Sequence, residues 1–329
     1  MKQNRLQALD LIKILAMFMV MTLHTCMHKM SDPIAFVVYF LSSIAIPLFF
    51  MVSGYLQGNR SVEARYILRK TGRILKFCFL ITTGLFLIQG VLYHADPISN
   101  YWHSFPGCFL QDGYCGQLWF LGALCIIYVL LPALIWGGQH WTYFYEKIFV
   151  LLIGVSSVVF ILNITCGLEH SIPQVFRIYN SLMYFIAGAL VRKYEDRLKI
   201  LIANGLFLIV SAIMFLFLTF SLRYSMGYSA FADRMFGSVN CILYAGILFV
   251  YIASKKINCK WIGLMSDIFL PCYVIHFIVI GHVLSFIQRI GLDSQWYSIL
   301  IELVIVYSLS CLISLALMRI PYINKIFRI

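Results

Sequence analysis

Apolar segments of membrane-spanning length follow one another through almost the whole of this 329-residue chain, and most charged residues stand between them. Apolar residues make up 62% of the chain and charged residues only 12%, whereas soluble domains carry about 25% charged residues. No soluble fold can bury so much apolar surface, because a folded protein must still present polar groups to water. These features exclude a soluble enzyme, a disordered chain and a secreted disulfide scaffold. They predict an all-α, polytopic integral membrane protein.

The apolar segments predict about ten transmembrane helices, since a helix needs about 20 apolar residues to cross a bilayer. No internal repeat, low-complexity tract or flexible linker separates them, so residues 1–329 are expected to form a single integral membrane domain. The expected spans are 8–28, 34–57, 74–93, 117–136, 147–166, 174–191, 200–220, 236–253, 264–287 and 297–318.

Lysine and arginine are distributed very unevenly between the two sides of these spans. One set of alternate loops, together with both termini, holds 19 of the 25 basic residues, and the other set holds five. Because lysine and arginine are retained on the cytoplasmic side, both termini are predicted to be cytoplasmic and the number of spans to be even. These clusters explain the net charge of +12, which therefore does not indicate a nucleic-acid partner.

The ten cysteines lie mostly within apolar segments, where they are expected to behave as small buried hydrophobic residues. The sequence contains no CxxC pair and no cysteine–histidine spacing typical of zinc sites, so no metal site is expected. Cys108 and Cys115 share one polar loop. Whether these two cysteines form a disulfide is left open by the sequence.

Ionisable side chains within a membrane span are costly, and they usually face a cavity or a partner. The first span carries Asp10, Lys13 and His24. The eleven residues from Lys13 to His24 return a helix to nearly the same face and separate the two by about 16 Å along the axis. A functional role is one interpretation; the alternative places Asp10 and Lys13 at the cytoplasmic interface and His24 at the outer one. Ordinary interface positions are expected for three residues near the predicted outer ends, Arg177, His282 and Glu302.

The first span also resembles the start of the membrane acyltransferase-3 family, whose members are inner-membrane O-acyltransferases that modify surface polysaccharides and related glycans. The family's hallmark is a basic residue followed, after ten residues, by a histidine; here these are Lys13 and His24, after an Arg5-to-Asp10 lead-in. Lysine replaces the more common arginine, which keeps the charge but not the fork of hydrogen-bond donors. Later segments resemble the family in the same order, namely Ser53-Gly54-Tyr55, the basic segment 65–77, 116–132 with Trp119, 181–191, and 264–280 with His276.

The resemblance implies a multi-pass enzyme of the inner (cytoplasmic) membrane. This enzyme would transfer an acetyl group from cytoplasmic acetyl-CoA to a hydroxyl of a surface or lipid-linked carbohydrate. Acetyl-CoA is a co-substrate in this scheme, no permanently bound cofactor is expected, and membrane lipids are the remaining partners. The expected catalytic residues are His24, Lys13 and Asp10. His24 is the general base that takes the hydroxyl proton, and Lys13 lies nearer the donor. Donor phosphates are expected at Arg5, Arg69, Lys70 and Arg73, and the substrate path is expected to be lined by Ser53, Tyr55, Trp119 and His276.

Ordinary structural interpretations of these residues remain open. Basic residues at a cytoplasmic helix end are expected for topology alone, and a small residue followed by glycine is often a helix-packing device. A second function class, a secondary transporter or glycan flippase, also fits an ionisable first helix, although the inverted repeats typical of transporters are not evident. A third interpretation is a sensor or partner subunit of the same fold without catalysis.

Overall fold

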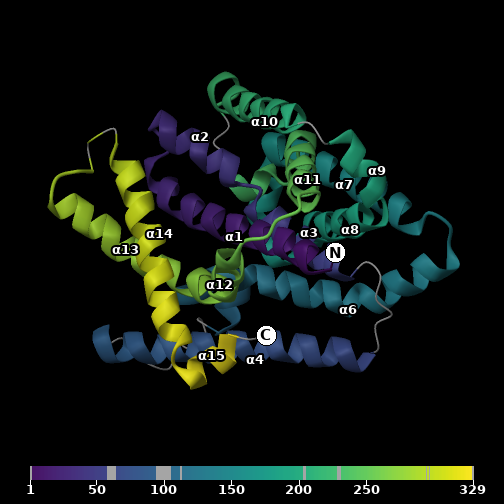
Figure 1. The fold of residues 1–329 in the computed structure, drawn as a ribbon. Helices are drawn as coiled ribbons and strands as arrows, with labels where there is room; N and C mark the ends of the chain where they lie inside the picture. The colour runs from purple at the N-terminus through teal and green to yellow at the C-terminus, as the bar shows by residue number, and fades with distance from the viewer. Residues whose placement is uncertain are drawn as a thin grey trace.

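The fold is built entirely from helices. The computed structural model describes residues 2–57, 64–93, 105–111, 113–202, 205–227, 231–293, 295 and 297–327, and no strand occurs in these ranges. The α-helices are α1 Lys2–Cys26, α2 Pro33–Ser42, α3 Ala45–Gln57, α4 Ala64–Tyr93, α6 Trp119–His140, α7 Phe144–Cys166, α8 Ile178–Lys193, α9 Glu195–Leu201, α10 Leu206–Ser225, α11 Val239–Ala253, α12 Lys260–Asp267, α13 Phe269–Arg289, α14 Ser298–Met318 and α15 Pro321–Phe327 (Figure 1). Short 3₁₀ helices connect them: η1 Met27–Lys29, η2 Gly113–Leu118, η3 Leu168–Ser171, η4 Gln174–Phe176 and η5 Ala232–Met235.

Seven segments of the described chain are long and apolar enough to cross a bilayer. These are Gln7–Lys29, Pro33–Gln57, Cys115–His140, Phe144–Cys166, Leu206–Ser225, Phe269–Arg289 and Ser298–Met318. The other three predicted spans coincide with the second half of α4 and with the shorter helices α8 and α11, of 16 and 15 residues. The all-helical, multi-pass architecture is therefore confirmed, whereas the number of ten spans stays a prediction.

Helix α1 lies at the centre of the bundle (Figure 1) and contacts α2, α3, α11, α12, α13 and α14. Ile12, Ala16, Met17 and Met21 of α1 are fully buried. Because neighbouring helices surround α1, its polar side chains face protein or internal space rather than lipid. The bundle thereby places the ionisable residues of the first span at its core.

The second predicted span, 34–57, is interrupted in its middle. Asp32 caps α2 by accepting hydrogen bonds from the backbone N–H groups of Ile34 and Ala35, at 2.7 and 3.0 Å, and Pro33 occupies the first helical position, where no N–H is needed. The helix ends at Ser42, and α3 begins three residues later. The predicted span 264–287 is interrupted in the same way, between α12 and α13.

Helices α3 and α8 approach each other more closely than side chains would allow. A Cβ atom on Gly54 would stand 1.7 Å from the carbonyl oxygen of Phe185, and one on Gly188 would stand 1.9 Å from that of Met51. Small residues permit such backbone contact, which is how many membrane helices associate in the absence of a hydrophobic driving force. The packing interpretation of the Ser53-Gly54 pair is therefore confirmed for Gly54.

Candidate active site

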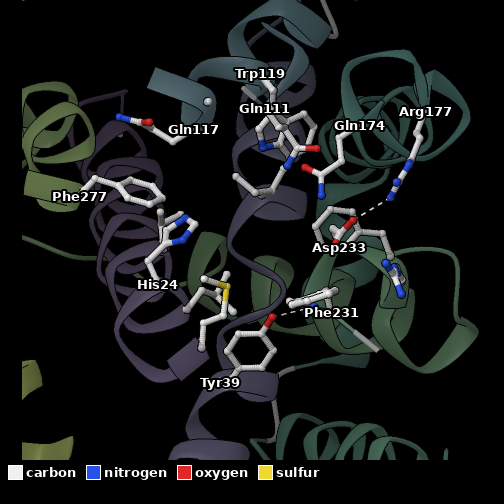
Figure 2. A pocket seen from close by; sticks show the side chains of 18 of the residues that line it. His24, Tyr39, Gln111, Gln117, Trp119, Gln174, Arg177, Phe231, Asp233 and Phe277 are labelled. Carbon is white, nitrogen blue, oxygen red and sulfur yellow. Dashed lines mark hydrogen bonds and ion pairs between the residues drawn. The ribbon is translucent and has the colours of Figure 1, made fainter. Parts of the chain in front are cut away.

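Two cavities lie along α1, one beside each end of the Lys13-to-His24 interval. The first, which we call the His24 cavity, has a volume of about 480 Å³. Figure 2 shows His24 beside Phe277 on one side of this cavity, with Gln174, Arg177 and Asp233 on the other. The second, the Lys13 cavity, also measures about 480 Å³ and is lined by Lys13, Ser53 and Lys70. One continuous helix thus presents a basic residue to each space.

His24 lies against two aromatic side chains of α13. The centre of its ring is 4.3 Å from that of Phe277 and 5.3 Å from that of His276. His276 is completely buried, and neither of its ring nitrogens has a hydrogen-bond partner among the described residues. The structure therefore brings together the two histidines that the sequence singled out on different spans.

Lys13 is held by an acidic neighbour one helical turn away. Its Nζ atom is 2.9 Å from Oδ1 of Asp10, and the same Oδ1 accepts a hydrogen bond of 3.0 Å from Ser266 of α12. Both side chains of the ion pair are partly exposed, at 28% and 25%. Asp10 therefore orients the Lys13 ammonium group at the wall of its cavity, and it connects α1 to α12.

Aromatic rings form the partition between the two cavities. Phe49 and Phe120 line the Lys13 cavity, and Tyr273 lines the His24 cavity. The ring centres of Phe49 and Phe120 are 5.5 Å apart, and those of Phe120 and Tyr273 are 5.3 Å apart. The Tyr273 hydroxyl donates a hydrogen bond to the backbone carbonyl of Gln117, which fixes that ring. We refer to Phe49, Phe120 and Tyr273 as the aromatic layer.

The four residues predicted to line a substrate path do not all line the same cavity. Trp119 lines the His24 cavity and Ser53 lines the Lys13 cavity, although the Ser53 hydroxyl donates its hydrogen bond to the Phe49 carbonyl, at 3.0 Å. His276 lies behind His24. Tyr55 lines neither of the two described cavities. Its hydroxyl donates a hydrogen bond of 2.8 Å to the carboxylate of Glu195. The Tyr55 side chain thus joins α3 to α9.

Of the residues predicted to bind donor phosphates, the structure places only Lys70 at the Lys13 cavity. Lys70 lines the Lys13 cavity, with its ammonium group 5.4 Å from the centre of the Tyr128 ring. Arg69 and Arg73 are exposed on α4 and line neither described cavity. The Arg5 side chain lies outside the described part of the structure.

Two residues expected at ordinary interface positions are buried instead. Arg177 is 8% exposed, and its NH1 group forms an ion pair of 2.7 Å with Asp233 at the wall of the His24 cavity. Glu302 is fully buried and paired at 2.5 Å with Lys29. The interface position stays a prediction for both residues, and an opposite charge from a segment distant in sequence compensates each buried charge. His282 is exposed.

The two cysteines of the predicted outer loop are free in the structure. Cys108 and Cys115 are both buried, and neither forms a disulfide. Burial was expected only of the cysteines in apolar segments, and it is found for four of them, Cys78, Cys125, Cys241 and Cys272.

A family model described as an acyltransferase domain, Acyl_transf_3, matches residues 6–319, nearly the whole chain. The chain belongs to the acyltransferase-3 family. Membership confirms the resemblance carried by Lys13 and His24, and it makes the protein a membrane acyltransferase in general terms. No curated protein and no solved structure matches this acyltransferase-3 chain. Its acyl donor, its acceptor and the roles of its residues therefore have to be argued from its own geometry.

Proposed function

We propose that this acyltransferase-3 protein transfers an acetyl group from cytoplasmic acetyl-CoA to a hydroxyl group of a surface or lipid-linked carbohydrate, with His24 as the general base. The single observation that carries the proposal is the pair of cavities on one helix, with Lys13 facing one and His24 facing the other. An enzyme whose donor and acceptor come from opposite compartments needs two separate approaches to one reaction centre.

The orientation follows from the charge distribution along the sequence. With 19 of 25 basic residues in one set of loops and at the termini, the positive-inside rule places both termini and the Lys13 cavity toward the cytoplasm. The same distribution requires an even number of spans, in agreement with the ten that the apolar segments predict, and the family resemblance favours the inner (cytoplasmic) membrane. The His24 cavity then opens toward the outer side, where carbohydrate acceptors are presented.

The Lys13 cavity suits the donor. Lys13 and Lys70 provide two ammonium groups at its wall, and ammonium groups bind phosphates as point charges. Arg69 and Arg73 are exposed on the same helix as Lys70 and add positive charge nearby, and Arg5 is assigned to the same end by the sequence. We expect the nucleotide phosphates to contact this basic surface while the pantetheine arm enters the cavity.

The His24 cavity suits the acyl-transfer step. A neutral His24 ring accepts the proton of the acceptor hydroxyl as that oxygen attacks the thioester carbonyl. The carbon–sulfur bond then breaks, and the departing thiolate takes the proton from the imidazolium, which restores His24. Direct attack by the hydroxyl is preferred to an acetyl-histidine intermediate, because His24 needs to move only one proton in this sequence.

The aromatic layer must change conformation before the thioester reaches His24. Phe49, Phe120 and Tyr273 contact one another through their rings, so rotation of one or two rings joins the two cavities. A layer that opens only around a pantetheine arm also keeps water and ions from crossing the membrane.

Acetyl transfer by the purified protein tests this function. Protein in detergent is given labelled acetyl-CoA and a glycan acceptor, and product is measured by mass spectrometry. His24→Ala is expected to lower transfer about a hundredfold or more, with unchanged expression and gel-filtration profile. The matched control is His140→Ala, because His140 is exposed, stacks on Trp136 and lines neither described cavity. Full transfer by His24→Ala would overturn the proposal.

The pair of cavities also favours one alternative, a secondary transporter or glycan flippase. Alternating access requires spaces on both sides of a thin barrier, and the aromatic layer between the cavities fits that description. Solute flux into proteoliposomes that continues without acyl-CoA, and that survives His24→Ala, would support transport over transfer.

A further inference from the structure

We infer that a groove between α13 and α14 binds one ethanolamine glycerophospholipid, with its phosphate at Arg289, an ester carbonyl at His282 and an acyl chain along the groove. The groove runs between two segments long and apolar enough to cross a bilayer, Phe269–Arg289 and Ser298–Met318. It shares no lining residue with either cavity on α1. The inference stands independently of the proposed function.

The groove is an apolar recess on the surface of the bundle. Helices α13 and α14 lie together at one edge of the fold (Figure 1), and the recess between them has a volume of about 360 Å³. Its walls include Phe286 and Leu309, which are 55% and 40% exposed. From Ile278 to Phe286 the groove extends about 12 Å along α13, which is most of the hydrocarbon depth of one leaflet, about half of 30 Å. The groove therefore has the length and the chemistry to hold an acyl chain.

His282 interrupts the otherwise apolar wall of this groove. It is the one polar residue among the described residues that line the groove, and its side chain is exposed. An imidazole that faces hydrocarbon loses its hydrogen bonds to water, whereas a neutral imidazole N–H can donate to a carbonyl oxygen. A glycerophospholipid carries ester carbonyls directly below its phosphate. A polyprenyl phosphate carries none, so this histidine favours a glycerophospholipid.

Arg289 lies at the end of the same face of α13. It follows Phe286 by three residues and His282 by seven, and both spacings return a helix to nearly the same face. Arg289 is the last residue of the apolar segment and is exposed, so it stands where the hydrocarbon gives way to headgroups. A guanidinium group binds phosphate through two parallel hydrogen bonds. Its Cα atom is about 10 Å beyond that of His282 along the axis, and the long arginine side chain can cover part of this interval.

The charges near this end of α13 favour a zwitterionic headgroup. Lys29 and Glu302 form an ion pair of 2.5 Å and neutralise each other. The carboxylate of Asp32 caps α2. Asp293, four residues beyond Arg289, is exposed, so the arginine that suits a phosphate has a carboxylate nearby that suits an ammonium group. Asp293 and Asp32 would repel a headgroup that carries only negative charge.

The groove lies on the opposite side of α13 from the candidate active site. Phe277 and Ile278 are consecutive residues, yet Phe277 lines the His24 cavity and Ile278 lines the groove. The ring centre of Phe277 is 4.3 Å from that of His24. A bound acyl chain therefore restrains the helical turn that packs against His24.

Lipid binding by the detergent-solubilised full chain tests the headgroup assignment. Native mass spectrometry is recorded with dioleoyl phosphatidylethanolamine, phosphatidylcholine, phosphatidylglycerol and undecaprenyl phosphate. We expect one phosphatidylethanolamine to bind more tightly than the other three lipids. Arg289→Gln is expected to lower that affinity about tenfold, the effect of losing a charge-assisted hydrogen bond. Arg319→Gln is the matched control, because Arg319 is exposed at the opposite end of α14 and lies outside the groove.

Two further variants test the groove itself. Leu309→Trp fills the recess and is expected to abolish phosphatidylethanolamine binding. Leu312→Trp is its control, since it adds the same bulk at a residue that is 62% exposed and does not line the groove. His282→Leu keeps an apolar wall and is expected to lower the affinity for phosphatidylethanolamine several-fold, because the ester carbonyl loses its donor.

The outcomes that would overturn the lipid site are distinct from those of the enzyme assay. Equal binding of phosphatidylethanolamine by wild type, Arg289→Gln and Leu309→Trp would overturn it, as would a preference for any of the other three lipids or the absence of binding. Unchanged affinity in His282→Leu would remove the ester contact. Gel filtration of each variant identifies any loss of fold. Because no acetyl-CoA is present, failure of acetyl transfer leaves this result unaffected.

Discussion

His276 packs behind His24 with the two ring centres 5.3 Å apart, yet it makes no hydrogen bond of its own to the described residues. Burying an imidazole costs free energy, and here the buried ring lies directly beside the proposed base. We expect His276 to act as a positioning residue that orients the base, through water or directly, once the substrates are bound.

His276→Leu should therefore raise stability and lower activity at the same time. Removing the two unsatisfied nitrogens is expected to stabilise the fold by about 1 kcal/mol, while transfer falls about tenfold. Thermal unfolding in detergent and acetyl transfer measure the two effects. Partial recovery of transfer by His276→Gln, which restores a polar group, distinguishes positioning from packing. Unchanged transfer in both variants would contradict the assigned role.

Gly54→Ala and Gly188→Ala are expected to separate α3 from α8. A methyl group at either position overlaps a backbone carbonyl that cannot move aside, and overpacking of this kind costs about 3 kcal/mol. Lower melting temperatures and poor recovery in detergent are the expected results. Gly84→Ala is the control, since a Cβ atom at Gly84 of α4 meets nothing within 4 Å; equal losses in all three variants would contradict the assigned contact.

Phe120→Ala is expected to open the aromatic layer. Loss of this ring, which contacts both Phe49 and Tyr273, joins the two cavities and admits water to the thioester. Acetyl-CoA hydrolysis without acceptor should rise several-fold relative to transfer. Phe217→Ala provides the comparison, because Phe217 is 73% exposed on α10. A Phe120→Ala protein with unaltered hydrolysis would argue against the partition.

Lys13 is expected to act through its charge. Lys13→Gln should raise the KM for acetyl-CoA about tenfold, the usual effect of losing a charge-assisted hydrogen bond, and Lys13→Arg should restore most of it. Lys256→Gln removes a charge from an exposed residue outside both described cavities and should leave KM unchanged. If the glutamine variant binds acetyl-CoA normally, Lys13 has no donor role.

Glu302→Ala is expected to destabilise the protein by about 3 kcal/mol, since it leaves Lys29 without its buried partner. The double variant Lys29→Met/Glu302→Leu removes both charges and should recover most of the stability. Chemical unfolding in detergent compares the three proteins. A double variant as unstable as the single one would show that the pair contributes more than mutual neutralisation.

Helical periodicity was enough to predict where α1 places Lys13 and His24 relative to each other. Because Lys13 and His24 are eleven residues apart on one uninterrupted helix, their common face and their separation followed from helix geometry alone. Burial of Cys125 and close packing at Gly54 also followed from residue type. These features depend on residue type and on spacing along the chain, and both can be read directly from one sequence.

The rest of the site depends on contacts between residues far apart in the sequence, which local patterns cannot predict. Arg177 and Asp233 are 56 residues apart, and no periodicity relates the two segments that bring them together. Gln174 has no distinguishing neighbour in the sequence, and only the fold places its side chain at the wall of the His24 cavity. The interruption between α2 and α3 falls at Ser43 and Ile44, shortly before Pro47, but apolar residues on both sides led the two helices to be predicted as one span.

The continuity of α1 sets a minimum size for any donor that serves both cavities. A rigid helix keeps Lys13 and His24 about 16 Å apart along its axis, and no rearrangement of side chains shortens that interval appreciably. A molecule anchored at Lys13 must therefore carry its reactive carbonyl on a long, slender arm. Under the proposed function, compact activated acetates such as acetyl phosphate are too short to occupy both places, so the helix would favour donors that carry the acyl group on a long arm.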